Sequence, residues 1–155
     1  MNVAKNVAWV VVLAAGLFAG QASAQVLNRE FQSARKVTLA NGVTMVRLNS
    51  DENAVLQPGD VLTITNVRFR GGRIALVMAA GDEQVDGDLD VEIIDERTGA
   101  RVAVDNGPEK NCATMWTPNQ TGPFTIRVLN PGRTAQRFIV AANWNEVETA
   151  MQTSR

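Results

Sequence analysis

Apolar and polar residues alternate with a period of two along most of the chain after residue 36. The alternation is clearest in residues 88–93, where Leu, Val and Ile are separated by Asp and Glu. Successive side chains of a strand point to opposite faces, so this pattern predicts half-buried strands rather than helices. Turn signals separate the segments, and we expect about eight or nine short strands. The fold class predicted is all-β, a single antiparallel β-sandwich.

The apolar positions of each predicted strand are expected to point into one shared core. The expected inward sets are Val67 and Phe69; Ile74, Leu76 and Met78; Leu89, Val91 and Ile93; Phe124, Ile126 and Val128; and Phe138, Val140 and Ala142. The turns between them are expected at Asn41-Gly42, Pro58-Gly59-Asp60, Gly71-Gly72, Thr98-Gly99 and Asn130-Pro131-Gly132. Glycine, Pro and Asn are common in turns because they adopt or preset the backbone angles that turns require.

The first 24 residues have the composition of a signal peptide. Lys5 precedes a stretch from Val7 to Gly20 that carries no charge, and Ala22-Ser23-Ala24 supplies the small residues of a cleavage site. The stretch is short for a permanent transmembrane helix, although an N-terminal anchor is the alternative. We therefore predict a periplasmic or secreted protein, with no permanent membrane anchor after signal cleavage. The mature chain would have 155 − 24 = 131 residues.

Two segments flank the predicted sandwich domain, which covers residues 37–143. Residues 25–36 are polar and mixed in charge, and they are expected to form an extended arm or linker. Residues 144–155 place Trp144, Val147 and Met151 at relative positions 0, +3 and +7. This spacing is compatible with one short C-terminal amphipathic helix, and a frayed tail is the alternative.

The composition excludes several kinds of catalysis. The chain contains no His and one Cys, so it cannot build a Ser-His-Asp or Cys-His nucleophile, nor a zinc site of the His₃, Cys₂His₂ or Cys₄ kind. Without Lys5 the charges are 14 basic and 16 acidic, a net of −2 that gives no field for nucleic acid. We expect no enzyme activity and no nucleic-acid partner. The single Cys112 is expected to be a buried small hydrophobic side chain.

Acidic residues are concentrated in one stretch. Eight of the sixteen acids fall within residues 82–96, with no basic residue among them. Like charges this close repel one another, and calcium prefers carboxylate oxygens. An EF-hand starting at Asp86 fails, because the sixth position is Val91 and the twelfth is Arg97. Two interpretations remain, a solvated acidic strand face or a calcium site of another kind, with the following candidate metal ligands: Asp86, Asp88, Asp90 and Asp105.

Arginines surround one predicted turn. Arg68, Arg70 and Arg73 flank Gly71-Gly72, and strand alternation puts Arg68 and Arg70 on one face. They are expected to pair with the acidic strand, to be solvated, or to contact a partner. Trp116 lies beside a turn rich in Pro and is either core or a surface anchor. Arg68, Arg70, Arg73 and Trp116 are the candidate partner-binding residues.

Residues 59–142 resemble the bacterial pre-peptidase C-terminal domain. The resemblance rests on an Asp-rich strand (88–95), a turn at Thr98-Gly99, a strand ending in Asp (102–105) and a Gly-aromatic strand (122–128). The final strand has Phe138 where the family often has Tyr, and the chain has no room for the peptidase that such domains usually follow. The resemblance implies a jelly-roll-like sandwich without catalysis, and it implies a ligand role for Asp88, Asp90 and Asp105, since some relatives bind calcium or insoluble polymers.

The function expected from the sequence is that of an exported, noncatalytic binding or accessory module. Its expected partner is a protein or polysaccharide of the cell envelope or extracellular space. The first alternative is a structural subunit of a periplasmic or surface assembly, docking through residues 25–36 or 144–155. The second is a hydrolase that uses carboxylates alone, such as Asp88 and Asp90.

Overall fold

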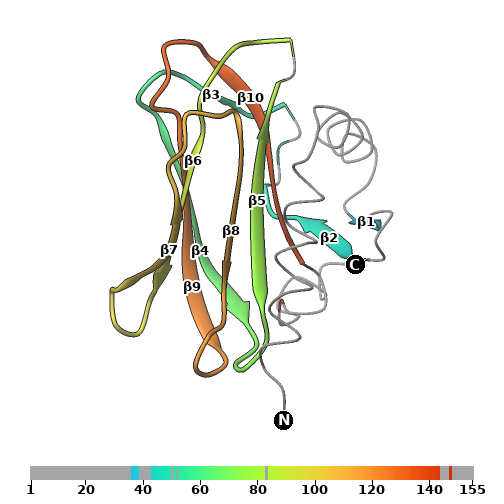
Figure 1. The fold of residues 1–155 in the computed structure, drawn as a ribbon, viewed down its shortest axis with the longest axis vertical. Coiled ribbons are helices and arrows are strands. Elements are labelled where there is room, and N and C mark those ends of the chain that lie inside the picture. The colour runs from blue at the N-terminus through green and yellow to red at the C-terminus, as the bar shows by residue number, and fades with distance from the viewer. Residues whose placement is uncertain are drawn as a thin grey trace.

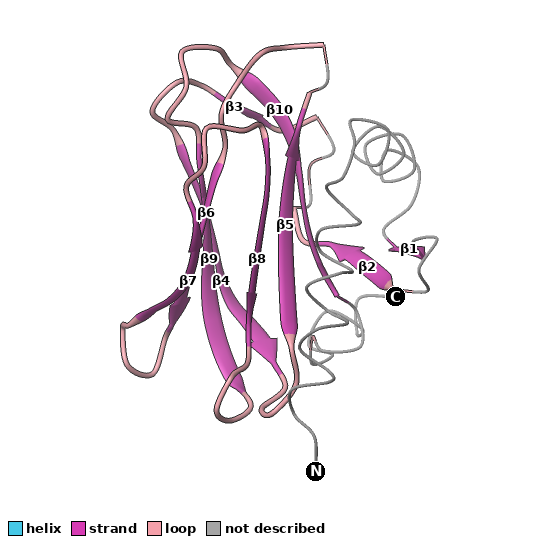
Figure 2. Ribbon diagram, in the orientation of Figure 1, coloured by secondary structure: helices cyan, strands magenta, loops and turns pink. Residues whose placement is uncertain are grey.

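The computed structural model describes residues 36–38, 43–49, 51, 53–82, 84–143 and 147. Within these residues the chain forms ten strands and no helix (Figure 2). The strands are β1 (Lys36–Thr38), β2 (Thr44–Arg47), β3 (Val55–Leu56), β4 (Val61–Phe69), β5 (Ala75–Gly81), β6 (Asp90–Asp95), β7 (Arg101–Asp105), β8 (Asn111–Trp116), β9 (Gly122–Leu129) and β10 (Gln136–Asn143).

The strands form two antiparallel sheets that lie face to face (Figure 1). The first sheet has the order β1-β2-β10-β5-β8, with β3 also paired to β10, and the second has the order β4-β9-β6-β7. In each sheet a late strand is inserted between early ones, β10 between β2 and β5 and β9 between β4 and β6. This is the double Greek-key order of a jelly roll. The predicted antiparallel β-sandwich of jelly-roll type is confirmed.

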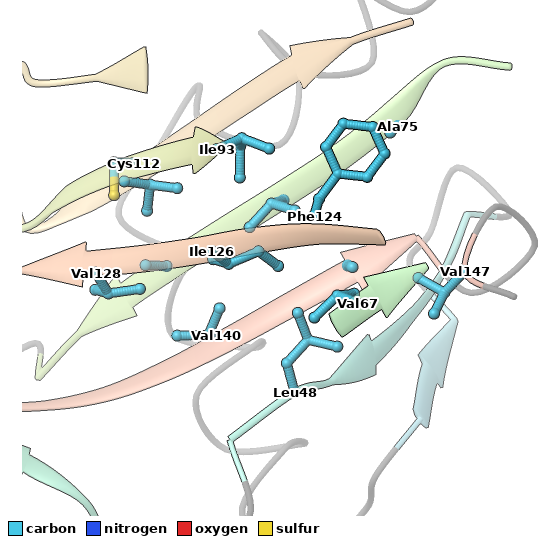
Figure 3. Close-up of a cluster of buried hydrophobic side chains, with 14 of the residues drawn as sticks. Leu48, Val67, Ala75, Ile93, Cys112, Phe124, Ile126, Val128, Val140 and Val147 are labelled. Carbon is cyan, nitrogen blue, oxygen red and sulfur yellow. The ribbon is translucent and has the colours of Figure 1, made fainter. Parts of the chain in front are cut away.

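The core lies between the sheets and is built by the alternation read from the sequence. Val91, Ile93, Ile126, Val128 and Val140 are all fully buried. Figure 3 shows side chains of both sheets meeting in this cluster. Side chains that alternate with them on β6 and β9 are only partly buried. A two-residue period therefore gives this part of the sandwich one apolar and one polar face.

The expected inward set of β5 is wrong. Ala75, Val77 and Ala79 point into the core between the sheets, whereas Leu76 and Met78 belong to a separate apolar cluster. All seven residues of β5 are buried, so both of its faces are apolar. Alternation then carries no information about which face is inward, because hydrophobicity does not distinguish the two sets. The core takes the small residues, and the larger Leu and Met side chains lie on the outer side.

β10 pairs with two short strands that lie one after the other along it. β3 pairs with its first residues and β2 with its last. Asn49 bridges the interruption. Its Nδ2 donates to the Phe138 carbonyl (3.3 Å), and its Oδ1 accepts from the Val140 amide (3.0 Å). A buried amide side chain thus replaces the missing backbone ladder, which satisfies groups that burial would otherwise leave without partners.

The predicted segments at the two ends are described only in part. The predicted signal peptide (1–24) and the turn Asn41-Gly42 lie outside the described residues, although β1 and β2 do pair antiparallel as a hairpin requires. Lys36, assigned to the arm, is the first residue of β1. In 144–155 only Val147 is described, and it forms an antiparallel bridge with Phe69; the rest of the predicted helix or tail lies outside the described residues. The described residues contain no helix able to cross a membrane.

Candidate binding surface

The outer side of the second sheet carries the polar residues that alternate with the core. We call this surface the polar sheet face, and it consists of the outward residues of four strands: Val61, Thr63 and Arg68 of β4; Asp90, Glu92 and Ile94 of β6; Val102 and Val104 of β7; and Thr125, Arg127 and Leu129 of β9. Strand register places them in rows across the sheet, for example Thr63 beside Arg127 and Arg127 beside Glu92. Charged and aliphatic side chains are therefore interleaved on one face of the sheet.

Glu92 is at the centre of the ion pairs on this face. Its Oε2 accepts from Arg127 Nη1 at 2.8 Å, and its Oε1 accepts from Arg101 Nη1 at 3.3 Å. Arg127 and Arg101 lie on the strands on either side of β6. Arg68 and Arg70 were expected to pair with the acidic strand, to be solvated or to contact a partner. β4 is not a neighbour of β6 in the sheet, because β9 lies between them. The alternation of residues 122–129 in the sequence already indicates that Arg127 points outward.

A second polar contact fixes the bulge in β4. Register shifts between Ile64 and Val67, and Asn66 adopts a positive φ of 57° there. The Asn66 amide donates to Glu96 Oε1 (2.6 Å), which also accepts from the Thr125 hydroxyl (2.8 Å). A carboxylate that accepts two hydrogen bonds holds the bulge against the neighbouring strand.

Exposed aliphatic side chains occur beside these ion pairs. Among the described residues the large hydrophobic side chains that remain exposed are Val55, Val61, Val102 and Val104, at 40–47%. Three of the four lie on the second sheet, and Val102 and Val104 lie on its edge strand β7. Protein interfaces combine apolar and polar side chains, and this part of the face offers both kinds. Sequence alternation alone did not single these valines out.

Three of the predicted metal-ligand candidates come together at one end of β6. Burial, and then repulsion from Asp105, raises the pKa of Asp88. Burial also raises the pKa of Asp90, with further contributions from Asp88, Asp105 and Glu92. One carboxylate oxygen of Asp88, Oδ1, is buried without a hydrogen-bond partner. We call Asp88, Asp90 and Asp105 the acidic group.

Asp105 has a structural role within the acidic group. Its Oδ1 accepts from the Gly107 amide (3.2 Å) and its Oδ2 from the Ala113 amide (2.9 Å), which ties the β7–β8 loop to β8. Asp86, the fourth candidate, is exposed in the preceding loop. In the part of the chain that the structure describes, no three His, Cys, Asp or Glu side chains are grouped closely enough to hold a metal ion. Calcium binding stays a prediction.

The four candidate partner-binding residues do not form one surface. Arg68 lies in β4 on the polar sheet face, whereas Arg70 and Arg73 are exposed at the β4–β5 turn. That turn contacts the loop after Trp116, since the Gly72 amide donates to the Pro118 carbonyl at 2.7 Å. The arginine turn and the tryptophan strand are thus neighbours, although the indole itself points inward.

Trp116 packs with the core, the first of the two interpretations from the sequence. Its ring meets Phe69 edge to face, with centroids 4.8 Å apart, and Phe124 at 5.5 Å. The guanidinium of Arg97 lies 5.9 Å from the Phe124 centroid and covers this end of the cluster. Edge-to-face contacts of this kind add to the stability gained from burying the rings. Four aromatic side chains are described. Phe69, Phe124 and Phe138 belong to the core cluster, and Trp116 packs against it.

Cys112 is buried, as expected for a small hydrophobic side chain. It is 2% exposed, is not in a disulfide and belongs to the core cluster. Burial raises the pKa of its thiol, with a further contribution from Asp105. A thiol that stays protonated is a poor nucleophile, so Cys112 is chemically inert in the folded chain.

Comparisons with known proteins add solved structures of low similarity. No family model and no curated protein matches the sequence. The chain is similar to the C-terminal family 6 carbohydrate-binding module of a marine laminarinase from Zobellia galactanivorans, with a TM-score of 0.37 and 13% identity over 70% of this chain and 86% of that one. A family 6 module from Clostridium cellulolyticum, in complex with xylose, gives 0.36 and 18% over 70% and 83%.

A third solved structure is a carbohydrate-binding module of Cellvibrio mixtus lichenase 5A in complex with cellotriose, with a TM-score of 0.36 and 14% identity over 70% of this chain and 82% of that one. At these TM-scores the function has to be argued from the residues of the chain itself. The resemblance to the pre-peptidase C-terminal domain, which none of these comparisons tests, stays a prediction.

Proposed function

We propose that the chain is an exported, noncatalytic binding or accessory module that contacts a protein of the cell envelope or extracellular space through the polar sheet face. The observation that supports this most is the exposure of Val61, Val102 and Val104 around the Glu92 ion pairs. Burying such valines against a partner is favourable, and the paired charges restrict which partner fits.

A polysaccharide ligand is the alternative, and the placement of the aromatic side chains makes it the weaker one. Sugar rings are usually bound by stacking on exposed aromatic rings. In the described residues Phe69, Phe124 and Phe138 are buried, and Trp116 packs against them. The polar sheet face offers aliphatic and charged side chains instead. A protein partner uses both kinds of contact.

The test is capture of envelope proteins on the immobilised mature chain, followed by affinity measurement with the purified partner. Val104→Asp places a carboxylate opposite Glu92 on an exposed strand edge, so we expect slightly lowered melting from the two like charges, an unchanged fold, and binding weakened by roughly tenfold or more. Val55→Asp is the matched control, because Val55 is as exposed but lies on the first sheet.

Three outcomes decide the matter. Loss of binding in Val104→Asp but not in Val55→Asp supports the proposed face. Equal binding by both variants and the unmodified chain overturns it. Binding that depends instead on residues 25–36 or 144–155 favours a structural subunit that docks through its ends.

A further inference from the structure

The first half of β4 lies at an open edge of the second sheet. Among the described strands β4 has β9 as its neighbour in the sheet, and the bridge from Phe69 to Val147 lies beyond the β4 bulge. Before the bulge, three side chains are exposed outward and two alternate with them and pack at the margin of the core, in the order Val61, Leu62, Thr63, Ile64 and Thr65. We call these five residues the β4 edge segment.

The backbone of the β4 edge segment directs alternate amides and carbonyls away from β9. The Asn130 amide donates to the Asp60 carbonyl at 3.1 Å, so the antiparallel ladder starts with a hydrogen-bonded pair immediately before Val61. Hydrogen-bonded and non-hydrogen-bonded pairs alternate along such a ladder, and the register is unbroken up to the bulge. The N–H and C=O groups of Leu62 therefore point to β9, and those of Val61 and Thr63 point to the open edge.

The β4 edge segment lacks the features that usually block pairing at a sheet edge. It contains no charged residue and no proline, and four of its five residues are β-branched, which favours strand pairing. The other edge of the same sheet, β7, has Arg101 and Asp105 at its ends and a register shift against β6. Charges and bulges of this kind prevent edge-to-edge pairing. The second sheet is therefore open to a further strand at β4 and protected at β7.

We propose that two copies of the chain pair through their β4 edge segments, antiparallel about a two-fold axis at Thr63. In this register Thr63 faces Thr63 of the second copy, Leu62 faces Ile64, and Val61 faces Thr65. Outward side chains meet outward ones, inward side chains meet inward ones, and no charge opposes another. The segment is thus complementary to itself, which is what a two-fold interface requires.

The same register satisfies the backbone groups at the open edge. Thr63 of each copy donates to and accepts from Thr63 of the other, because both residues direct these groups outward. The bulge ends the pairing, since Asn66 has a φ of 57° and its amide donates to Glu96. Five paired residues extend about 17 Å, a smaller contact than the interface of an obligate dimer. We therefore expect a reversible dimer with a dissociation constant on the order of 100 µM.

The test is sedimentation equilibrium of the mature chain from about 10 µM to about 1 mM, a range that spans the expected dissociation constant. Thr63→Asp places two carboxylates opposite each other at the axis, whereas within one chain the new carboxylate lies beside Arg127. We expect this variant to fold and its dimerisation to be weakened by roughly tenfold or more. Val104→Asp places the same charge on β7, at the other edge of the sheet, and leaves the dimer intact.

A mixture of the Thr63→Asp and Thr63→Lys variants tests the position of the axis. Each variant repels its own copy, whereas opposite charges facing each other restore pairing in the mixture. Restored association supports the two-fold axis at Thr63, and a mixture that stays monomeric contradicts it. An unmodified chain that is monomeric at about 1 mM, or a dimer that Thr63→Asp leaves unchanged, overturns the proposal. A monomer whose captured partner no longer binds the Thr63→Asp variant shows that a partner strand occupies the edge instead.

Amide hydrogen exchange of the unmodified chain gives a second measurement, which needs no variant to fold. We expect the Thr63 amide to exchange several-fold more slowly at about 1 mM than at about 10 µM, because pairing protects it. The Leu62 amide, which points to β9 at both concentrations, is the control. Equal exchange of the Thr63 amide at the two concentrations contradicts the dimer. Because Val104→Asp is expected to weaken partner binding and to spare the dimer, this proposal and the proposed function can fail separately.

Discussion

At the scale of single residues, strand alternation sets the environment of each charge. Glu92 is outward, is paired with two arginines and lies on a face where such pairs contribute about 0–1 kcal/mol to stability. Asp95 ends the same strand but is buried. Arg97 donates to it from Nη2 (2.7 Å), Nε (3.0 Å) and the backbone amide (3.0 Å), and these hydrogen bonds lower the pKa of Asp95. Glu92 and Asp95, on the same strand, therefore differ in how much they contribute to the stability of the folded chain.

The acidic group predicts a measurable pH dependence. The pKa values of Asp88 and Asp90 are raised in the folded chain, so the folded state binds more protons than the unfolded state from about pH 3.8 up to those raised values, and stability falls as the pH rises through that interval. Asp90→Asn removes one of the repelling charges. We expect it to stabilise the protein at pH 7 by about 0.5 kcal/mol, and by less at pH 3.

Urea denaturation at pH 3, 5 and 7 measures this effect, and Asp86→Asn is the control, since Asp86 is an exposed acid of the same loop. A gain that is equal at all three pH values would contradict electrostatic repulsion as the cause. Asp95 contributes in the opposite sense. Its pKa is lowered, so its stabilisation is present above the unfolded value of about 3.8 and is lost as the pH falls through the folded one.

At the scale of elements, the β4–β5 turn shows two different requirements for glycine. Gly72 has a φ of +71°, and a Cβ placed there would meet nothing within 4 Å. A Cβ on Gly71 would lie 2.5 Å from the Gln120 Cα. The Gly71 amide also donates to the Thr121 hydroxyl at 3.0 Å, which holds the turn against the loop before β9. One glycine is needed for its backbone conformation and its neighbour for close packing.

This difference predicts unequal costs for two adjacent substitutions. Gly72→Ala pays only the left-handed backbone penalty, about 1 kcal/mol. Gly71→Ala must push apart two backbone segments, so we expect a cost of about 2 kcal/mol. Thermal denaturation of both variants gives the comparison. Gly72→Asn tests the backbone explanation, because Asn tolerates the left-handed region, and a cost as large as that of Gly72→Ala would count against it.

At the scale of the whole molecule, the jelly roll joins segments that are distant in sequence. The acidic group forms in this way, because the pairing of β6 with the end of β7 brings Asp88 and Asp90 close to Asp105. If calcium binds there, it stabilises the folded chain by mass action. That hypothesis predicts a higher melting temperature with millimolar calcium, a reversal by chelator and loss of the effect in Asp90→Asn. Melting that is the same with calcium and with chelator would exclude the site.

The sequence by itself determined the sandwich, the core faces of β4, β6, β9 and β10, and most of the turns. β4, β6 and β9 have one apolar and one polar face, so local alternation is sufficient there, whereas β10 carries buried apolar side chains on both faces. It misjudged β5, whose two faces are equally apolar, and it did not identify Arg101 and Arg127 as the partners of Glu92. Only the tertiary structure decided these points, because strand order and the covering of a sheet depend on contacts between distant segments that no local period records.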